Sequence, residues 1–250
     1  MKWEFLNTKS NTGKYNMDYD MNLAENAQPG TALLRFYKWK PYCISLGANQ
    51  DFSTINLKKA YDNNIDLLER PTGGRAILHS EELTYSVVYP LDNGFSPKEL
   101  YREINLALKK GMIFFDNELE KIELEKEQPY FPNYYKDRKS ELCFAVSAKN
   151  ELKFEGKKLV GSARRKLHNT ILQHGSILCG DFHKKIVEFL FLNYEETVQM
   201  KEEIKNTTTD LRSILNYEID YDLLVESIKT GFEEHFKIKF ENPLNQVKIK

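Results

Sequence analysis

The chain of 250 residues has a formal net charge of −1, with 41% hydrophobic and 29% charged residues, which is ordinary for a globular protein with a sizeable core. A chain this close to neutral lacks the basic surface of a general nucleic-acid binder, and no apolar run is long enough to be a signal peptide or to cross a bilayer. Three cysteines at unrelated spacings (Cys43, Cys143 and Cys179) indicate free thiols, so we expect a cytoplasmic protein.

The N-terminal third predicts strands with short helices between them. The first twenty residues are polar and rich in asparagine, and Asn22–Asn26 is interpreted as the end of a short helix. Alternation of apolar and polar residues then predicts a strand at Glu82–Tyr89. The remaining elements expected here are strands at Thr31–Tyr37, Tyr42–Leu46 and Ile65–Leu68 and a short helix at Leu57–Asn63.

A helix start follows at Ser96, where serine can cap, proline takes the first helical position and Glu99 can close a capping box. Leu100, Ile104 and Leu108 then repeat every four residues, which predicts one apolar stripe lying on a sheet.

The middle of the chain is charged and then strand-like. Glu118–Gln128 is interpreted as a solvated surface segment and Pro129–Lys139 as a mobile connection. Leu142–Ala148 alternates as a strand does, with Cys143 on the face opposite Leu142. A hairpin is expected from strands at Leu152–Phe154 and Lys158–Val160 around a turn at Glu155–Lys157.

The C-terminal third adds a strand at Ile171–Leu178 and is otherwise helical. Asp181 is expected to cap a helix at His183–Leu192, and Tyr221–Phe236 places four apolar residues on one face. Strands in hairpin-like groups with helices between them predict an α+β fold, with one domain over residues 1–250 and a mixed β-sheet flanked by helices.

The decapeptide Arg70–His79 is the most informative stretch. Its glycine pair lets a ligand lie against bare main chain, and arginines on both sides supply fixed positive charge with planar donors. Such a loop suits an acyl group carried on an anionic handle, such as phosphate or phosphopantetheine. A hairpin turn with solvated flanks would contain the same residue types.

A second pair of residues suggests thiol chemistry. A free thiol has a pKa of about 8.5, and a lysine ammonium within a few ångströms would lower it and favour the nucleophilic thiolate. Cys143 and Lys158 lie on neighbouring predicted strands that could bring them together. Each residue alone has a simpler interpretation, a buried strand cysteine and a solvated hairpin lysine.

The ordered set of motifs resembles the lipoate-protein ligase and octanoyltransferase superfamily from about residue 16 to residue 240. Within it, the chain is most similar to the cysteine-dependent octanoyltransferases that act on octanoyl-acyl carrier protein. The blocks that carry the resemblance are Leu34–Trp39, Ser45–Gly47, Arg70–His79 continuing into Glu82–Val88, Cys143-Phe144, Gly156–Ala163 and Leu172–Leu178.

The resemblance implies a biotin/lipoate ligase-type catalytic domain without an accessory domain. It also implies that Cys143 carries the octanoyl group as a thioester and that Lys158 lowers its pKa, while strand alternation directs Lys157 to the opposite face. Cys43 and Cys179 match no nucleophile position and are expected to be structural. The residues expected to line the acyl tunnel or bind substrate are Arg70, Gly73, Gly74, Arg75, His79, Gly161, Ser162 and Ala163.

Two departures from the family pattern stand out. Arg164-Arg165-Lys166 follows the Gly-Ser-Ala run where the family often has glutamine, which puts contacts near the tunnel mouth in doubt. Glu69 replaces the arginine that commonly precedes Arg70, which weakens the argument for nucleotide-phosphate binding. The basic run could instead steer an acidic partner, or be an ordinary solvated loop.

The implied reaction moves octanoate from acyl carrier protein to the lysine of apo lipoyl domains, such as the glycine-cleavage H protein or 2-oxoacid dehydrogenase acyltransferase subunits. It needs no ATP, metal or other cofactor, and we expect a monomer without nucleic-acid or membrane partners. The alternatives are an octanoyl relay amidotransferase that takes the acyl group from the H protein, an ATP-dependent lipoate-protein ligase, and a non-catalytic carrier-binding protein.

Overall fold

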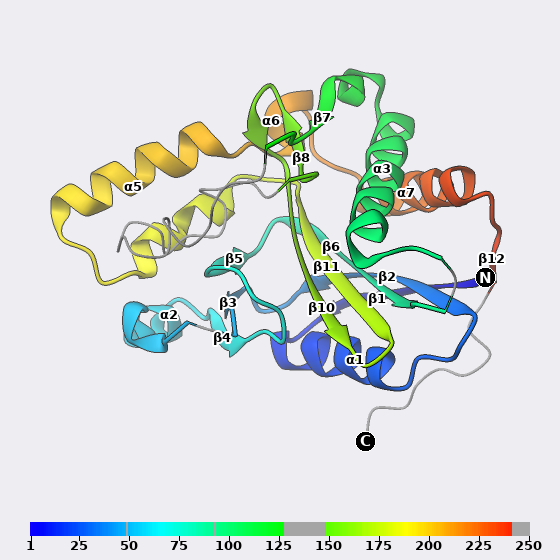
Figure 1. Cartoon of the computed structure of the whole chain (residues 1–250). Coiled ribbons are helices and arrows are strands. Elements are labelled where there is room, and N and C mark those ends of the chain that lie inside the picture. Colours follow the sequence, from blue (N-terminus) through cyan, green and yellow to red (C-terminus); the bar gives the residue numbers. More distant parts are fainter. Residues whose placement is uncertain (49, 93, 128–148, 242–250) are drawn as a thin grey trace.

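A six-stranded mixed sheet forms the centre of the molecule, in the order β10-β11-β6-β2-β1-β12 (Figure 1). The computed structural model describes residues 1–48, 50–92, 94–127 and 149–241. β1 pairs in parallel with β2 and β12, and the other neighbours are antiparallel. The strands are β1 (Lys2–Asn11), β2 (Thr31–Trp39), β6 (Glu82–Pro90), β10 (Val160–Leu167), β11 (Thr170–Leu178) and β12 (Phe240–Glu241).

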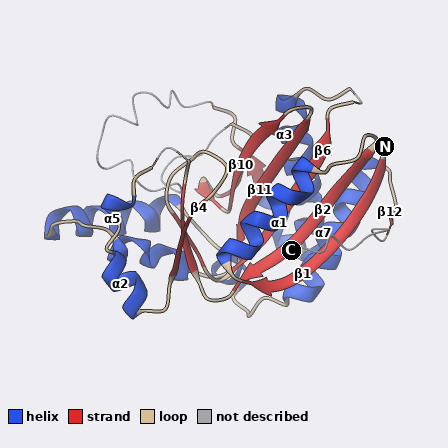
Figure 2. Ribbon diagram, turned by 90° about the horizontal axis from the view of Figure 1, so that it is seen from below, coloured by secondary structure: helices blue, strands red, loops and turns tan. Residues whose placement is uncertain are grey.

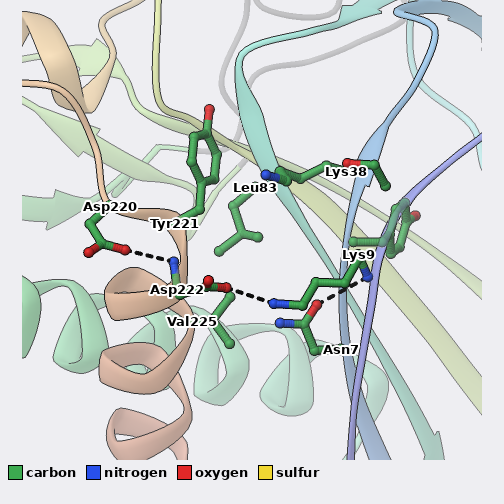
Figure 3. A pocket seen from close by; sticks show the side chains of 10 residues that line it. Asn7, Lys9, Lys38, Leu83, Asp220, Tyr221, Asp222 and Val225 are labelled. Carbon is green, nitrogen blue, oxygen red and sulfur yellow. Dashed lines mark hydrogen bonds and ion pairs between the residues drawn. The ribbon is translucent and has the colours of Figure 1, made fainter.

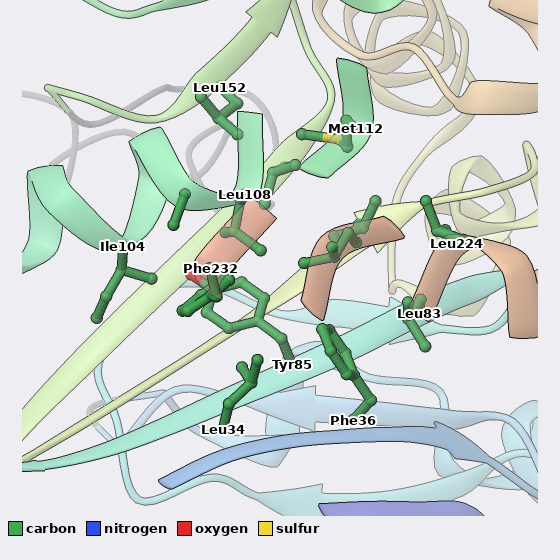
Figure 4. Close-up of a cluster of buried hydrophobic side chains, with 14 of the residues drawn as sticks. Leu34, Phe36, Leu83, Tyr85, Ile104, Leu108, Met112, Leu152, Leu224 and Phe232 are labelled. Carbon is green, nitrogen blue, oxygen red and sulfur yellow. The ribbon is translucent and has the colours of Figure 1, made fainter. Parts of the chain in front are cut away.

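Helices cover both faces of this sheet (Figure 2). α3 (Pro97–Phe115) and α7 (Tyr221–Phe236) lie on one face, and α1 (Gly13–Glu25) lies on the other. The main core fills the space between the sheet and the α3–α7 pair. Figure 4 shows Leu34 and Phe36 of the sheet facing Ile104 and Leu108 of α3. Burial of this stripe, at about 25 cal/mol per Å² of apolar surface, holds the layers together.

A smaller sheet, ordered β4-β3-β5, lies beside the large one and has its own core. Its strands are β3 (Cys43–Leu46), β4 (Asp66–Glu69) and β5 (Ile77–His79). The helices of this region are α2 (Leu57–Asp62), α5 (Tyr194–Thr207) and 3-10 helices at Phe52–Thr54 and Phe182–Phe189.

A third sheet, ordered β7-β8-β9, contains the expected hairpin. β8 (Leu152–Phe154) pairs with β9 (Lys157–Lys158). Glu155 and Gly156 have φ of 49° and 79° between them, as a tight hairpin turn requires. β7 (Ile122–Leu124) completes the sheet, and α6 (Leu211–Leu215) precedes α7.

The predicted α+β architecture, with a mixed sheet flanked by helices, is confirmed. The capping box at Ser96 and Glu99 is present, and Tyr221–Phe236 is helical as expected. The other strands predicted inside the described residues occur with small differences at their ends. The predicted strand Leu142–Ala148 and the connection Pro129–Lys139 lie outside the described residues.

Four predictions need correction. The N-terminus contains a strand and a helix that starts at Gly13; β1 was missed because main-chain pairing with β2 and β12, more than alternation, defines it. Glu118–Gln128 is not wholly solvated: a 3-10 helix at Asn117–Lys121 and β7 bury Leu119 and Ile122 beneath the charges.

The third correction concerns Asp181, which makes no capping bond; the helix predicted at His183–Leu192 is the 3-10 helix Phe182–Phe189, and the Asp181 carboxylate lies 3.4 Å from Arg212. The fourth concerns the Arg70–His79 loop. Its last three residues form β5, because Ile77–His79 pairs with Cys43–Ser45 of β3.

Candidate functional site

The glycine loop between β4 and β5 is fixed at its base and open at its tip. The Arg70 N–H donates to Leu46 O at 2.9 Å, and the Ala48 N–H donates to Thr72 O at 3.2 Å. The Arg70 side chain is buried, whereas Gly73 and Gly74 are exposed. Gly47 lies so close that a Cβ there would fall 2.1 Å from Gly74 O. The exposed main chain of the glycine pair is therefore available to a ligand.

One face of β10 and β11 is directed toward this loop. Arg165 donates to Pro71 O at 2.9 Å, and His174 Nε2 shares a 2.7 Å hydrogen bond with the Thr72 hydroxyl. By strand alternation Gly161 and Ala163 belong to the same face as Arg165. The structure thus brings Gly161 and Ala163 to the side of the sheet on which the glycine loop lies.

Ser162 belongs to the opposite face, toward α3. Its Oγ lies 2.7 Å from Tyr85 Oη, and Gln173 Nε2 donates to the same Tyr85 oxygen at 2.9 Å. Burial raises the pKa of Tyr85 to about 12, so the phenol stays protonated and can donate. Residues 161–163 were expected to line one tunnel together, but the strand divides them between two faces.

Lys158 is 2% exposed, and its ammonium pairs with a carboxylate that the sequence interpretation missed. Nζ lies 2.8 Å from Glu151 Oε2, and Glu151 is 3% exposed. Glu151 Oε1 accepts the main-chain N–H of Ser162 at 3.1 Å. One carboxylate therefore connects Lys158 with the strand that contains Gly161–Ala163.

The register of the hairpin contains the signal that would have found Glu151. Lys153 pairs with Lys158, so Glu151 is the same-face diagonal neighbour of Lys158 across the hairpin. The neighbouring Lys157 is partly exposed, and its Nζ lies 3.5 Å from Lys205 O. The expected division of the two lysines between opposite faces is seen in the structure.

The three cysteines differ in what the structure describes. Cys143 lies outside the described residues. Cys43 and Cys179 are buried free thiols, and burial raises the pKa of both, that of Cys179 to about 12. A thiol in such surroundings is a poor nucleophile, which agrees with the structural role expected for Cys43 and Cys179.

His79 is buried rather than directed to solvent. Its Nε2 lies 2.7 Å from Ser45 Oγ, its Nδ1 lies 2.8 Å from Glu82 Oε1, and its ring stacks on Trp39 at 3.9 Å. Arg75 is half-buried at the end of the glycine loop. Among the residues of the basic run, Arg164 donates to Pro97 O and lies over the Tyr101 ring, so it is tied to α3.

A separate pocket of about 230 Å³ lies where β1 and β2 meet the start of α7 (Figure 3). Lys9 and Asp222 form an ion pair across it at 2.7 Å, and no predicted site residue lines it. It is smaller than most small-molecule sites. Within the described ranges no three His, Cys, Asp or Glu side chains gather as a metal site would, and no helix there is long and apolar enough to span a membrane.

Comparison with known proteins gives consistent results for sequence and structure. The family model for the lipoyl protein ligase A/B catalytic domain matches residues 12–233. The octanoyltransferase LipM of Clostridioides difficile is 34% identical over 250 residues, covering 96% of this chain and 89% of that protein. LipM of Macrococcus caseolyticus is 32% identical over 249 residues, with the same coverage.

Solved structures share the fold at lower identity. A lipoate-protein ligase A bound with ATP superposes with a TM-score of 0.75 at 18% identity, covering 97% of this chain and 89% of that chain. A bipartite lipoate protein ligase from Thermoplasma acidophilum gives a TM-score of 0.75 at 19% identity, covering 97% and 87%. The fold, the family match and the relatives agree, and the chain belongs to the lipoyl protein ligase A/B catalytic domain family.

Proposed function

We propose that the protein is an octanoyltransferase of protein lipoylation, which moves octanoate from acyl carrier protein to the lysine of apo lipoyl domains. Relatives at 32% and 34% identity over 96% of the chain have the name octanoyltransferase, which supports the transfer of an octanoyl group. The carrier-protein donor and the absence of ATP and metal from the reaction are part of the proposal, as are the monomeric state and cytoplasmic location.

The observation that carries the proposal is the buried ion pair of Lys158 and Glu151. Desolvation of an unpaired ammonium would favour loss of its proton, and the adjacent carboxylate opposes that loss. A buried cation held in this way can stabilise a thiolate nearby. Because the same carboxylate binds the N–H of Ser162 at 3.1 Å, the cation is fixed relative to β10.

The proposed reaction has two steps. The Cys143 thiolate attacks the carbonyl carbon of the octanoyl thioester, and the carrier's sulfur leaves and takes up a proton. The neutral amine of the lipoyl lysine then attacks the Cys143 thioester, forms the amide and loses a proton, while the Cys143 sulfur leaves as the thiolate that Lys158 stabilises. The energy comes from the thioester itself, so the reaction needs no nucleotide.

The acyl chain is proposed to lie between the exposed Gly73-Gly74 main chain and the face of β10 that contains Gly161 and Ala163. Those positions have at most one side-chain carbon each, so they leave room for an alkyl chain. Arg75 at the end of the loop is proposed to bind the anionic handle of the donor.

The test is a two-stage transfer assay on the full chain. Octanoyl-acyl carrier protein alone should leave one octanoyl group on Cys143, detected by mass spectrometry and removed by hydroxylamine. An apo lipoyl domain added afterwards should receive that group on its lysine without ATP. Full activity of Cys143→Ser would exclude the thioester route, and a requirement for ATP and free lipoate would identify a ligase instead.

The donor is decided in the same assay. Octanoyl-H protein is offered beside octanoyl-acyl carrier protein at equal concentration, and a preference for the H protein would identify a relay amidotransferase. Lys158→Ala should raise the pH at which the Cys143 thiol is alkylated, whereas Lys157→Ala, the matched control one residue away, should not. Equal profiles for the two variants would remove the role proposed for Lys158.

A further inference from the structure

The guanidinium of Arg70 is directed into the protein, where its five N–H groups meet five acceptors. Nε donates to Gly73 O at 3.3 Å, and Nη2 donates to Gly73 O at 3.1 Å and to Arg75 O at 2.7 Å. Nη1 donates to Ser45 O at 2.9 Å and to Ser45 Oγ at 3.1 Å. A guanidinium has five donors in a rigid fork, so this set accounts for all of them.

These bonds join the glycine loop to β3. Two of the acceptors are main-chain carbonyls of the loop, at Gly73 and Arg75, and the other two belong to Ser45. A peptide's N–H is directed opposite to the C=O of the same unit. Holding the Gly73 carbonyl toward Arg70 therefore directs the Gly74 N–H away from the loop interior.

Behind Arg70 lies a second, fully buried row of hydrogen bonds, formed by Ser45, His79 and Glu82. The separations are 2.7 Å between Ser45 Oγ and His79 Nε2 and 2.8 Å between His79 Nδ1 and Glu82 Oε1. Thr84 and Ser176 donate to the same carboxylate oxygen at 2.6 and 2.7 Å. The carboxylate only accepts, so His79 Nδ1 holds its proton toward Glu82.

These three side chains have the order and spacing of a nucleophilic Ser-His-acid triad. Ser45, however, is 0% exposed, and its Oγ already accepts an N–H of Arg70. A hydroxyl in this position orients a neighbour and does not attack a substrate.

We propose that Arg70 is a positioning residue, set by Ser45, His79 and Glu82, which fixes the main chain of the glycine loop and does not itself bind the donor's phosphate. This inference rests on the proposed function, because the loop's task is to hold the acyl donor. Only Arg75 of the two loop arginines then contacts the anionic handle.

The first experiment separates positioning from phosphate binding. Octanoyl transfer is measured with octanoyl-phosphopantetheine and with octanoyl-pantetheine, which lacks the phosphate, for the wild type and Arg70→Lys. Lysine cannot supply the five-donor fork, so we expect kcat/KM to fall roughly 10- to 100-fold, equally for both donors. A loss confined to the phosphorylated donor overturns the proposal. Arg102→Lys, an exposed arginine on α3, is the matched control.

The second experiment does not depend on activity. Amide hydrogen exchange of Arg70 and Ala48, whose N–H groups close the loop base, is measured in wild type, Arg70→Lys and Ser45→Ala. Both variants should exchange these amides faster while α3 keeps its protection. Unchanged exchange at both amides overturns the proposal, even if the wild type transfers octanoate.

Ser45→Ala is the milder variant and keeps the experiment decisive if Arg70→Lys does not fold. A fluorophosphonate probe, which labels activated serines, is expected to leave Ser45 unmodified, and labelling there overturns the positioning role. If the wild type transfers octanoate from neither donor, the proposed function fails, and the exchange measurement still decides the role of Arg70.

Discussion

The Nζ of Lys158 lies 2.8 Å from Oε2 of Glu151, and both side chains are at most 3% exposed. Taking two charges out of water is costly, and removal of one partner from such a pair typically destabilises a protein by about 3–5 kcal/mol. A pair of this kind is weak evidence for stability as such. Its position at the start of β10 makes it a way to keep a cation charged beside the proposed thioester chemistry.

Replacing Glu151 tests this relationship. Glu151→Gln keeps the shape of the side chain but removes the counter-charge, so the buried Lys158 should lose its proton more readily and stabilise a thiolate less well. We expect octanoyl transfer to fall roughly 10- to 100-fold, with alkylation of the Cys143 thiol shifted to higher pH. Glu155→Gln, on the exposed turn of the same hairpin, is the control. An unshifted alkylation profile for Glu151→Gln would limit Glu151 to a structural role.

A methyl group at Gly73 tests whether a ligand lies against the glycine loop. A Cβ at Gly73 meets no atom within 4 Å, so Gly73→Ala should leave the unfolding free energy within about 0.5 kcal/mol of the wild type. Its kcat/KM for octanoyl transfer should nevertheless fall, because the methyl group occupies the space of the donor. Gly47→Ala is the contrast, since its Cβ would lie 2.1 Å from Gly74 O and must displace the loop. Wild-type activity of Gly73→Ala would place the donor elsewhere.

Tyr85 and Tyr101 form a natural pair for testing the polar cluster around Ser162. Tyr85→Phe removes a hydroxyl that bonds Gln173 and Ser162, which should cost about 1–3 kcal/mol of unfolding free energy. The buried Tyr101 hydroxyl has no hydrogen-bond partner within the described part of the chain, so Tyr101→Phe should be neutral or stabilising. Urea unfolding of both variants measures the difference, and equal losses would contradict this assignment.

His174 predicts how stability depends on pH. Burial lowers its pKa below the ordinary value of 6.5, although Asp20 acts in the other direction. The unfolded chain therefore takes up a proton before the folded chain does, and the stabilisation present above pH 6.5 is lost as the pH falls toward the folded-state pKa. Urea unfolding at pH 7.5, 6.5 and 5.5 should show falling stability, with a shallower fall for His174→Gln. An identical slope for the variant would assign the effect to other groups.

Short-range patterns predicted the elements whose signals are local. The capping box at Ser96, the four-residue repeat on α3 and the alternation of Glu82–Tyr89 are each set by backbone geometry within a few residues. The pattern failed where pairing partners are distant. β1 is held by main-chain bonds to β2 and β12, and Leu119 and Ile122 are buried only because β7 meets β8.

For the site, the sequence by itself determined which chemistry is present: a glycine loop between arginines, and a lysine beside a Gly-Ser-Ala run. Only the tertiary structure decided which groups meet. Arg70 turns inward to carbonyls, Ser162 faces α3 rather than the loop, and Glu151 reaches Lys158. The reason is that a strand's alternation separates its side chains into two faces, while strand register and the burial of charge decide which partner each face receives.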